Sequence, residues 1–200
     1  VRAYLTGSTS TSVWRNYAAG VRDYCGHRLP DGMKKNQPLP RALVTPTTKS
    51  DEHDALTSGD ELVDGGVVDR ATWQRMEETA LALFARGQEI AARNGLILVD
   101  TKYELAWDSD GKLMLIDEVH TPDSSRYWIA DSYAARLAAG QEPENIDKEF
   151  LRLWFVDNCD PYNDPTLPAA PDELVVELSS RYITLYERIT GRAFEPALEP

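Results

Sequence analysis

Apolar residues recur at steps of three and four along two long stretches of the chain, residues 71–93 and residues 172–190. This spacing places the apolar side chains on one face of an α-helix. Asp69 is a suitable N-cap and Gly95 a suitable C′ residue for the first stretch, and Gly191 ends the second. We therefore predict two long helices. Shorter helices are predicted over residues 130–139 and 146–157.

Between the two long helices, the pattern of apolar residues changes from the helical spacing to one typical of β-strands. Residues 95–105 and 112–119 are joined by Asp108-Ser109-Asp110-Gly111, and Asp-Gly is a typical tight-turn pair. These runs predict an antiparallel hairpin, and residues 1–5 predict a further strand. The remaining polar segments, rich in proline and glycine, are expected to form loops: residues 6–12, 20–48, 122–126 and 160–171. The segment over residues 20–48 is expected to contain short strands as well. The sequence predicts an α+β fold with a central antiparallel hairpin or sheet flanked by helices.

Length and composition are those of a folded globular domain. Of the 200 residues, 42% are apolar and 27% are charged, so we expect a single α+β unit over residues 1–200. A net charge of −12 disfavours binding to nucleic acid or to an anionic membrane, but is compatible with a local basic pocket for a phosphorylated metabolite. Two distant cysteines form no zinc or disulfide pattern, and no apolar run reaches the ~18 residues of a membrane span, so we expect a cytoplasmic protein.

Three charged residues alternate along the predicted strand over residues 95–105. Asp100, Lys102 and Glu104 are two residues apart, which places them on one face of a continuous strand, and Asp117 is expected nearly opposite Lys102. Two neighbouring carboxylates with no histidine or cysteine nearby suit Mg²⁺. A solvated sheet face in which Lys102 bridges its neighbours explains the same pattern, and the spacing alone does not decide between the two interpretations.

Two further segments carry groups that bind anions. Arg2 precedes the Thr6-Gly7-Ser8 turn, which offers backbone N–H groups and hydroxyls. The segment after the hairpin, residues 120–126, contains Asp123, two serines and Arg126, whose guanidinium is a natural partner of phosphate or carboxylate. Taken alone, the segment over residues 120–126 is better explained as a capped loop with Asp123 as an N-cap, and the Thr6-Gly7-Ser8 turn is a weak signal.

In combination, these segments resemble the SAICAR synthetase family. The resemblance is carried by Arg2-x3-Thr6-Gly7-Ser8, Asp100-x-Lys102-x-Glu104 and the segment from Asp117-Glu118 to Tyr127-Trp128. It extends over the chain to Lys49, His53-Asp54, Asp147-Lys148-x3-Arg152 and Thr190-Gly191. Leu105-Ala106 replaces the Phe-Gly that usually follows the family's strand. Family members also carry an N-terminal nucleotide-binding lobe, and we expect this chain to be the central and C-terminal part without it.

The resemblance implies an ATP-dependent ligase of purine biosynthesis. Such enzymes join L-aspartate to the carboxylate of CAIR, a carboxylated aminoimidazole ribonucleotide, through an acyl phosphate. The alternative is a fragment or module that binds nucleotide or phosphate without turnover. An oligomer is possible.

The resemblance also implies roles for individual residues. Glu104 and Asp117 match the Mg²⁺ ligands at the ATP phosphates. Lys102 would neutralise charge at the reacting group, and Asp100 would hold the amine or ribose of CAIR. The CAIR 5′-phosphate would bind to Arg2, Ser8 and Arg126. The rest of the substrate pocket would be lined by Asp123, Lys148, Arg152, Lys49, His53 and Asp54.

Overall fold

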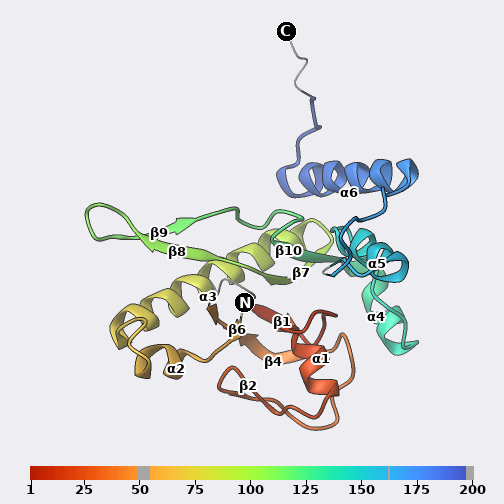
Figure 1. Cartoon of the computed structure of the whole chain (residues 1–200). Helices are drawn as coiled ribbons and strands as arrows, with labels where there is room; N and C mark the ends of the chain where they lie inside the picture. Colours follow the sequence, from red (N-terminus) through yellow and green to blue (C-terminus); the bar gives the residue numbers. More distant parts are fainter. Residues whose placement is uncertain (49–54, 162, 197–200) are drawn as a thin grey trace.

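Four antiparallel strands form the sheet at the centre of the chain. The computed structural model describes residues 1–48, 55–161 and 163–196 (Figure 1). Its largest sheet has the strand order β10-β7-β1-β4. These strands span Ser125–Ile129 (β10), Leu96–Thr101 (β7), Arg2–Tyr4 (β1) and Pro38–Leu43 (β4). The strand predicted at the start of the chain is confirmed, whereas β10 begins inside the segment predicted to be a loop, residues 122–126.

The predicted helices are present and cover this sheet. Helix α3 (Arg70–Arg93) packs against β7, and its N-cap Asp69 accepts a hydrogen bond from Thr72 N at 2.9 Å. Helix α6 (Asp172–Thr190) ends at Gly191, whose φ of 66° is left-handed, as expected of a C-terminal glycine. The two remaining predicted helices are α4 (Ala130–Ala138) and α5 (Glu149–Asn158).

The main core lies between the sheet and helices α3 and α6. It includes Phe84 from α3, Leu98 from β7, Tyr127 from β10 and Leu185 from α6, each at most 2% exposed. On the outer side, α6 packs on α5, where the Arg181 guanidinium lies over the ring of Phe150. Helix α3 therefore buries the apolar face that its spacing predicted, whereas in α6 only Leu185 is buried and in α4 and α5 no residue is.

The segment over residues 20–48 is the expected ordered excursion with short strands. Its strands are β2 (Asp23–Tyr24), β3 (His27–Arg28), β4 and β5 (Thr47–Thr48), and β5 pairs with β6 (Ala55–Leu56). A second core holds the excursion, with Leu5, Val13 and Tyr24 among its buried members. Two short helices that the sequence pattern did not predict flank it, α1 (Val13–Ala18) and α2 (Gly59–Asp64).

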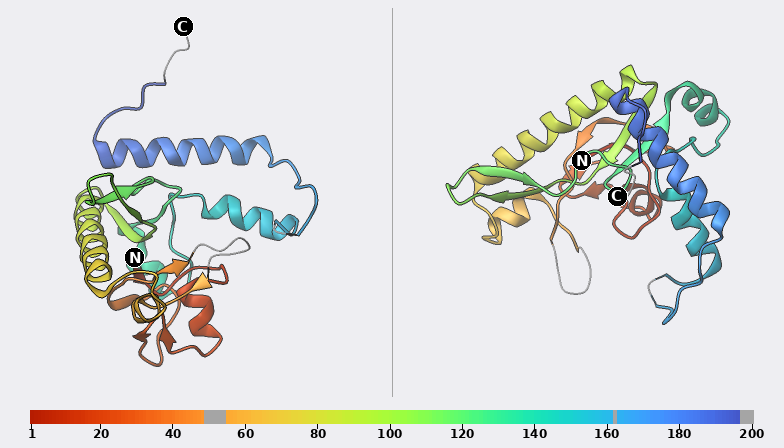
Figure 2. Two further views of the ribbon diagram at one scale, coloured as in Figure 1. Left: turned by 60° about the vertical axis from the view of Figure 1, so that its left-hand side comes forward. Right: turned by 90° about the horizontal axis from the view of Figure 1, so that it is seen from above.

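The predicted hairpin forms, but the strand that leads into it is broken. Strand β8 (Glu104–Trp107) pairs with β9 (Leu113–Ile116), and Glu104 lies opposite Ile116. Between β7 and β8, Lys102 N instead donates to Ser124 O at 3.0 Å. The prediction of one continuous strand over residues 95–105 is therefore wrong. The hairpin projects from the end of the four-stranded sheet (Figures 1 and 2).

None of the helices in the described residues combines the length and the apolar character needed to cross a membrane.

Candidate functional site

The register of the central sheet brings Asp100 between two arginines. Asp100 lies opposite Arg2 of β1 on one side and opposite Arg126 of β10 on the other. Its Oδ2 atom is 2.6 Å from Arg126 Nη1 and 3.5 Å from Arg2 Nη1. Burial opposes the charge of Arg126, but the carboxylates around it overcome this effect and raise the pKa of its guanidinium. The structure thus joins three predicted site residues in one charged row.

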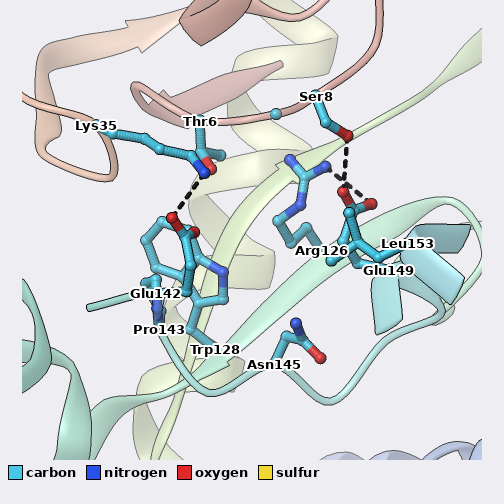
Figure 3. Close-up of a pocket in the computed structure, with 11 residues that line it drawn as sticks. Thr6, Ser8, Lys35, Arg126, Trp128, Glu142, Pro143, Asn145, Glu149 and Leu153 are labelled. Atoms are coloured by element: carbon cyan, nitrogen blue, oxygen red, sulfur yellow. Dashed lines mark hydrogen bonds and ion pairs between the residues drawn. The ribbon is translucent and has the colours of Figure 1, made fainter. Parts of the chain in front are cut away.

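A fourth side chain, Glu149, links this row to the other predicted anion-binding groups. Ser8 Oγ donates to Glu149 Oε1 at 3.0 Å (Figure 3). Glu149 Oε2 is 3.1 Å from Arg152 Nη1 and 3.5 Å from Arg126 Nη2. The sequence pattern missed Glu149, because the alternating charges of residues 144–152 indicated a solvated helix face, whereas its side chain is only 13% exposed. The available signal was its place in the first turn of α5, beside Lys148 and Arg152.

Two cavities meet at Arg126 and Glu149. The first encloses about 130 Å³ and is bounded by the Thr6-Gly7-Ser8 turn and by Trp128. Lys35 Nζ and Glu142 Oε1, both in its lining, form an ion pair at 2.6 Å (Figure 3). The second cavity, of about 110 Å³, brings together five residues predicted for the substrate pocket: Asp100, Asp123, Arg126, Lys148 and Arg152.

The Thr6-Gly7-Ser8 turn requires its glycine. Gly7 has a φ of +103°, and a Cβ at this position would lie 2.5 Å from Ser12 Cβ. The preceding Thr6 is buried and donates from Oγ1 to Asn36 Oδ1 at 2.7 Å. The turn is therefore fixed at both ends, which places Ser8 at the mouth of the first cavity.

On the far wall of the second cavity, Asp123 is held from two helices. It accepts a hydrogen bond from Tyr182 Oη of α6 at 2.8 Å and pairs with Lys148 Nζ at 3.1 Å. Partial burial acts to raise the pKa of Asp123, but these two donors outweigh it, and the pKa lies below its ordinary value. The carboxylate is therefore ionised and leaves Lys148 partly neutralised.

Asp147 is a second acidic residue whose role the sequence did not indicate. It is 3% exposed and accepts hydrogen bonds from Tyr127 N at 3.0 Å and from Glu149 N at 2.8 Å. Burial raises its pKa to about 6, despite these hydrogen bonds. It anchors the start of α5 to β10, so the position of Glu149 depends on it.

Lys102, Glu104 and Asp117 form a separate cluster where the hairpin begins. Lys102 Nζ lies 2.9 Å from Glu104 Oε1 and 3.1 Å from Asp117 Oδ2. The hydrogen bond to Glu104, with that to Asp117, raises the pKa of Lys102. Asp117 follows the end of β9 and has a φ of 73°. The expectation that Asp100 shares one strand face with Lys102 and Glu104 is wrong, because the chain leaves the sheet at Lys102.

In the described part of the chain, no group of three or more histidine, cysteine, aspartate or glutamate side chains could hold a metal ion. Glu104 and Asp117 nevertheless converge on one ammonium group. Two carboxylates are the protein share of a typical Mg²⁺ site, in which phosphates and water complete the coordination. The donor set therefore fits Mg²⁺ held jointly with a phosphorylated ligand. Lys49, His53 and Asp54 lie outside the described residues.

The fold and the site together gather arginine and hydroxyl groups between the ends of strands and the start of a helix. A model of the SAICAR synthetase family matches residues 1–168. The chain belongs to the SAICAR synthetase family.

Close relatives are longer than this chain. It is 57% identical over 194 residues to the phosphoribosylaminoimidazole-succinocarboxamide synthase of Legionella pneumophila, covering 97% of this chain and 62% of the relative. The chloroplastic enzyme of Arabidopsis thaliana is 57% identical over 202 residues, covering 100% of this chain and 49% of the relative. The chain thus spans about half to three fifths of these relatives.

A solved structure supports the fold. SAICAR synthase from Saccharomyces cerevisiae, determined in complex with SAICAR, matches with a TM-score of 0.78 and 31% identity, covering 98% of this chain and 60% of that one. The predicted α+β, SAICAR-synthetase-like fold is confirmed.

Proposed function

We propose that this chain forms the part of a SAICAR synthetase that binds CAIR and carries the metal-binding carboxylates. The whole enzyme uses ATP to join L-aspartate to CAIR, giving SAICAR, ADP and phosphate. The observation that carries the proposal is the convergence of Arg2, Ser8, Arg126 and Arg152 on two carboxylates, in a chain that belongs to this family. Such a concentration of donors suits a phosphate monoester despite the net charge of −12.

The CAIR 5′-phosphate binds to Ser8, Arg2 and Arg126 in this proposal. Asp100 already accepts from both arginines, so it fixes their orientation and offers its remaining lone pairs to the amine or ribose of the nucleotide. Asp123, Lys148 and Arg152 line the cavity beyond and form the rest of the substrate pocket. Lys49, His53 and Asp54 are proposed for the same pocket from the family resemblance alone.

Glu104 and Asp117 would hold Mg²⁺ together with the phosphates of ATP. When bound, this ion neutralises charge on the phosphates during phosphoryl transfer. Lys102 lies between the same two carboxylates, and its raised pKa keeps it cationic at neutral pH. It therefore supplies positive charge at the group being transferred. The γ-phosphoryl group passes to the CAIR carboxylate, and the amine of aspartate then displaces phosphate from the acyl phosphate.

This chemistry depends on positioning and on charge neutralisation rather than on a protein nucleophile. The described cysteines support that view, because burial raises the pKa of Cys25 to about 11 and leaves its thiol protonated. The nucleotide-binding lobe is proposed to lie in the part of the relatives that this chain does not cover. A cytoplasmic location and an oligomeric state stay predictions.

A second candidate function is a module that binds the nucleotide without turnover. It is favoured by the coverage of only 62% of a close relative, because the groups proposed for CAIR lie within the chain while those proposed for adenine do not. It predicts CAIR binding without consumption of ATP.

The experiment is the formation of SAICAR from CAIR, L-aspartate, ATP and Mg²⁺ by the purified protein, with its intact mass measured on the same sample. From a sample whose mass shows that it includes the nucleotide-binding lobe, we expect SAICAR and ADP in equal amounts, and no SAICAR when aspartate is omitted. CAIR binding without product would favour the module, and neither binding nor product would contradict both functions.

A further inference from the structure

We infer that Glu149 is an internal occupant of the phosphate-binding site, which competes with the substrate phosphate for Ser8 and Arg126 and also engages Arg152 of the substrate pocket. This inference rests on the proposed function of that site. It adds a residue that sets how strongly the site binds anions.

The contacts of Glu149 are those expected of a bound anion. A hydroxyl and two guanidinium groups donate to its two carboxylate oxygens from three elements: the turn after β1, strand β10 and helix α5. Their distances lie between 3.0 and 3.5 Å. A carboxylate and a phosphate present similar oxygen acceptors to such donors. Three groups proposed to bind the substrate are thus already engaged by a single side chain.

The place of Glu149 allows it to leave without disturbing the fold. Its backbone is fixed, because its N–H donates to the buried Asp147 at 2.8 Å in the first turn of α5. Its side chain has three rotatable bonds and lies in the wall shared by both cavities, so rotation about these bonds can carry the carboxylate away (Figure 3).

Arg126 stays oriented when Glu149 leaves. Its other nitrogen, Nη1, remains 2.6 Å from Asp100, and that contact is shorter than the 3.5 Å between Nη2 and Glu149. The shorter ion pair therefore positions the guanidinium, while the longer one is open to exchange. This asymmetry distinguishes a competing anion from a structural ion pair.

The consequence is a higher threshold of affinity that any anion must exceed to occupy the site. A phosphate dianion cannot share these donors with Glu149 at close range, because like charges at such distances repel. The need to displace Glu149 therefore weakens the binding of every anion by a similar factor. A nucleotide regains that loss through contacts of its base and ribose, whereas inorganic phosphate does not. Glu149 therefore keeps small anions out of the site and holds its donors in place until the substrate arrives.

The test is the Glu149→Gln variant of the whole protein, with CAIR and inorganic phosphate titrated separately by calorimetry. Glutamine keeps the shape and one acceptor for Ser8 but removes the charge. We expect both ligands to bind about tenfold more tightly than to the wild-type protein, as one competing charged contact predicts. The phosphate binding that is lost in the Arg126→Ala variant is the binding that belongs to this site.

The matched control is Glu89→Gln, which removes the same charge from an exposed pair with Arg86 on α3 and should change neither affinity. Should Glu149→Gln fail to fold, Glu149→Asp retracts the carboxylate by one methylene and is expected to strengthen phosphate binding too. Unchanged or weaker phosphate binding in the folded variant overturns the inference. Absence of CAIR binding with tighter phosphate binding contradicts the proposed function and not this inference.

Discussion

Lys102 is held by two carboxylates, and its contacts are separate from those of the residues proposed for the phosphate. Its ammonium contacts Glu104 at 2.9 Å and Asp117 at 3.1 Å. Asp100, two residues earlier, instead contacts Arg126 and Arg2. The two groups of residues can therefore be tested separately by substitution.

Glu104→Gln and Asp117→Asn should each lower kcat by about 100-fold or more, since a metal ion at the phosphates stabilises charge in the transition state by several kcal/mol. CAIR affinity should change less than about threefold, because the contacts described for both carboxylates are with Lys102 and not with the arginines proposed for the phosphate. Steady-state kinetics and CAIR titration measure the two effects. Asp110→Asn, exposed on the turn of the same hairpin, serves as the control. Wild-type turnover in either variant would show that these carboxylates hold no required metal.

Asp147 should make the stability of the protein depend on pH in an unusual direction. Its pKa is raised by burial from 3.8 to about 6, so the native state binds more protons than the unfolded state between these values. Stability present at low pH is therefore lost as the pH rises through this window, by roughly 3 kcal/mol at most. Urea unfolding from pH 4 to 7 should show this decline relative to Asp147→Asn. A difference that is constant or grows with pH would contradict the assignment.

At the scale of elements, the sequence predicted what depends on local signals. Helix α3 follows the predicted range within a residue, because its apolar period and both caps lie in the chain itself. Strand β10 was missed because Ser125 and Arg126 are polar, and their strand conformation arises from pairing with β7. The break after Thr101, between β7 and β8, has no counterpart in the alternating pattern of residues 95–105.

Gly87 on α3 offers a test of how closely the hairpin segment packs on the helix. A Cβ at this position would lie 2.3 Å from Cε1 of His120, which is hydrogen-bonded to Tyr103, and 2.7 Å from Leu98 Cδ2. Helix propensity alone predicts that Gly87→Ala stabilises the protein by about 1 kcal/mol. We expect the clash to outweigh this gain and to destabilise it by about 1–3 kcal/mol.

Thermal and urea unfolding measure the effect of Gly87→Ala. The control is Ala85→Gly, at an exposed position of the same helix, which should cost only the propensity difference of about 1 kcal/mol. Stabilisation by Gly87→Ala would show that His120 does not pack against α3 in this way.

At the scale of the whole molecule, the site joins residues that no local pattern could relate. Ser8 and Glu149 are 141 positions apart, and Arg2 and Asp100 are 98 apart. The family resemblance identified Arg2, Ser8 and Arg126, because their motifs are specific in combination. It gave no role to Glu149, whose significance depends on the packing of α5 beside β10. The predicted arginines therefore lie close together, and only the three-dimensional structure shows that Arg126 and Arg152 both contact Glu149.

The most direct test of this account is calorimetric titration of SAICAR into the whole protein and its Arg126→Ala variant. Loss of one charged contact to the phosphate should weaken binding by about 10- to 100-fold, while Arg86→Ala, on the exposed face of α3, should leave it unchanged. Ser8→Ala, at an exposed position, should weaken binding by a smaller factor without lowering Tm. SAICAR binding that is absent, or equally tight without Arg126, would contradict the assignment of this site.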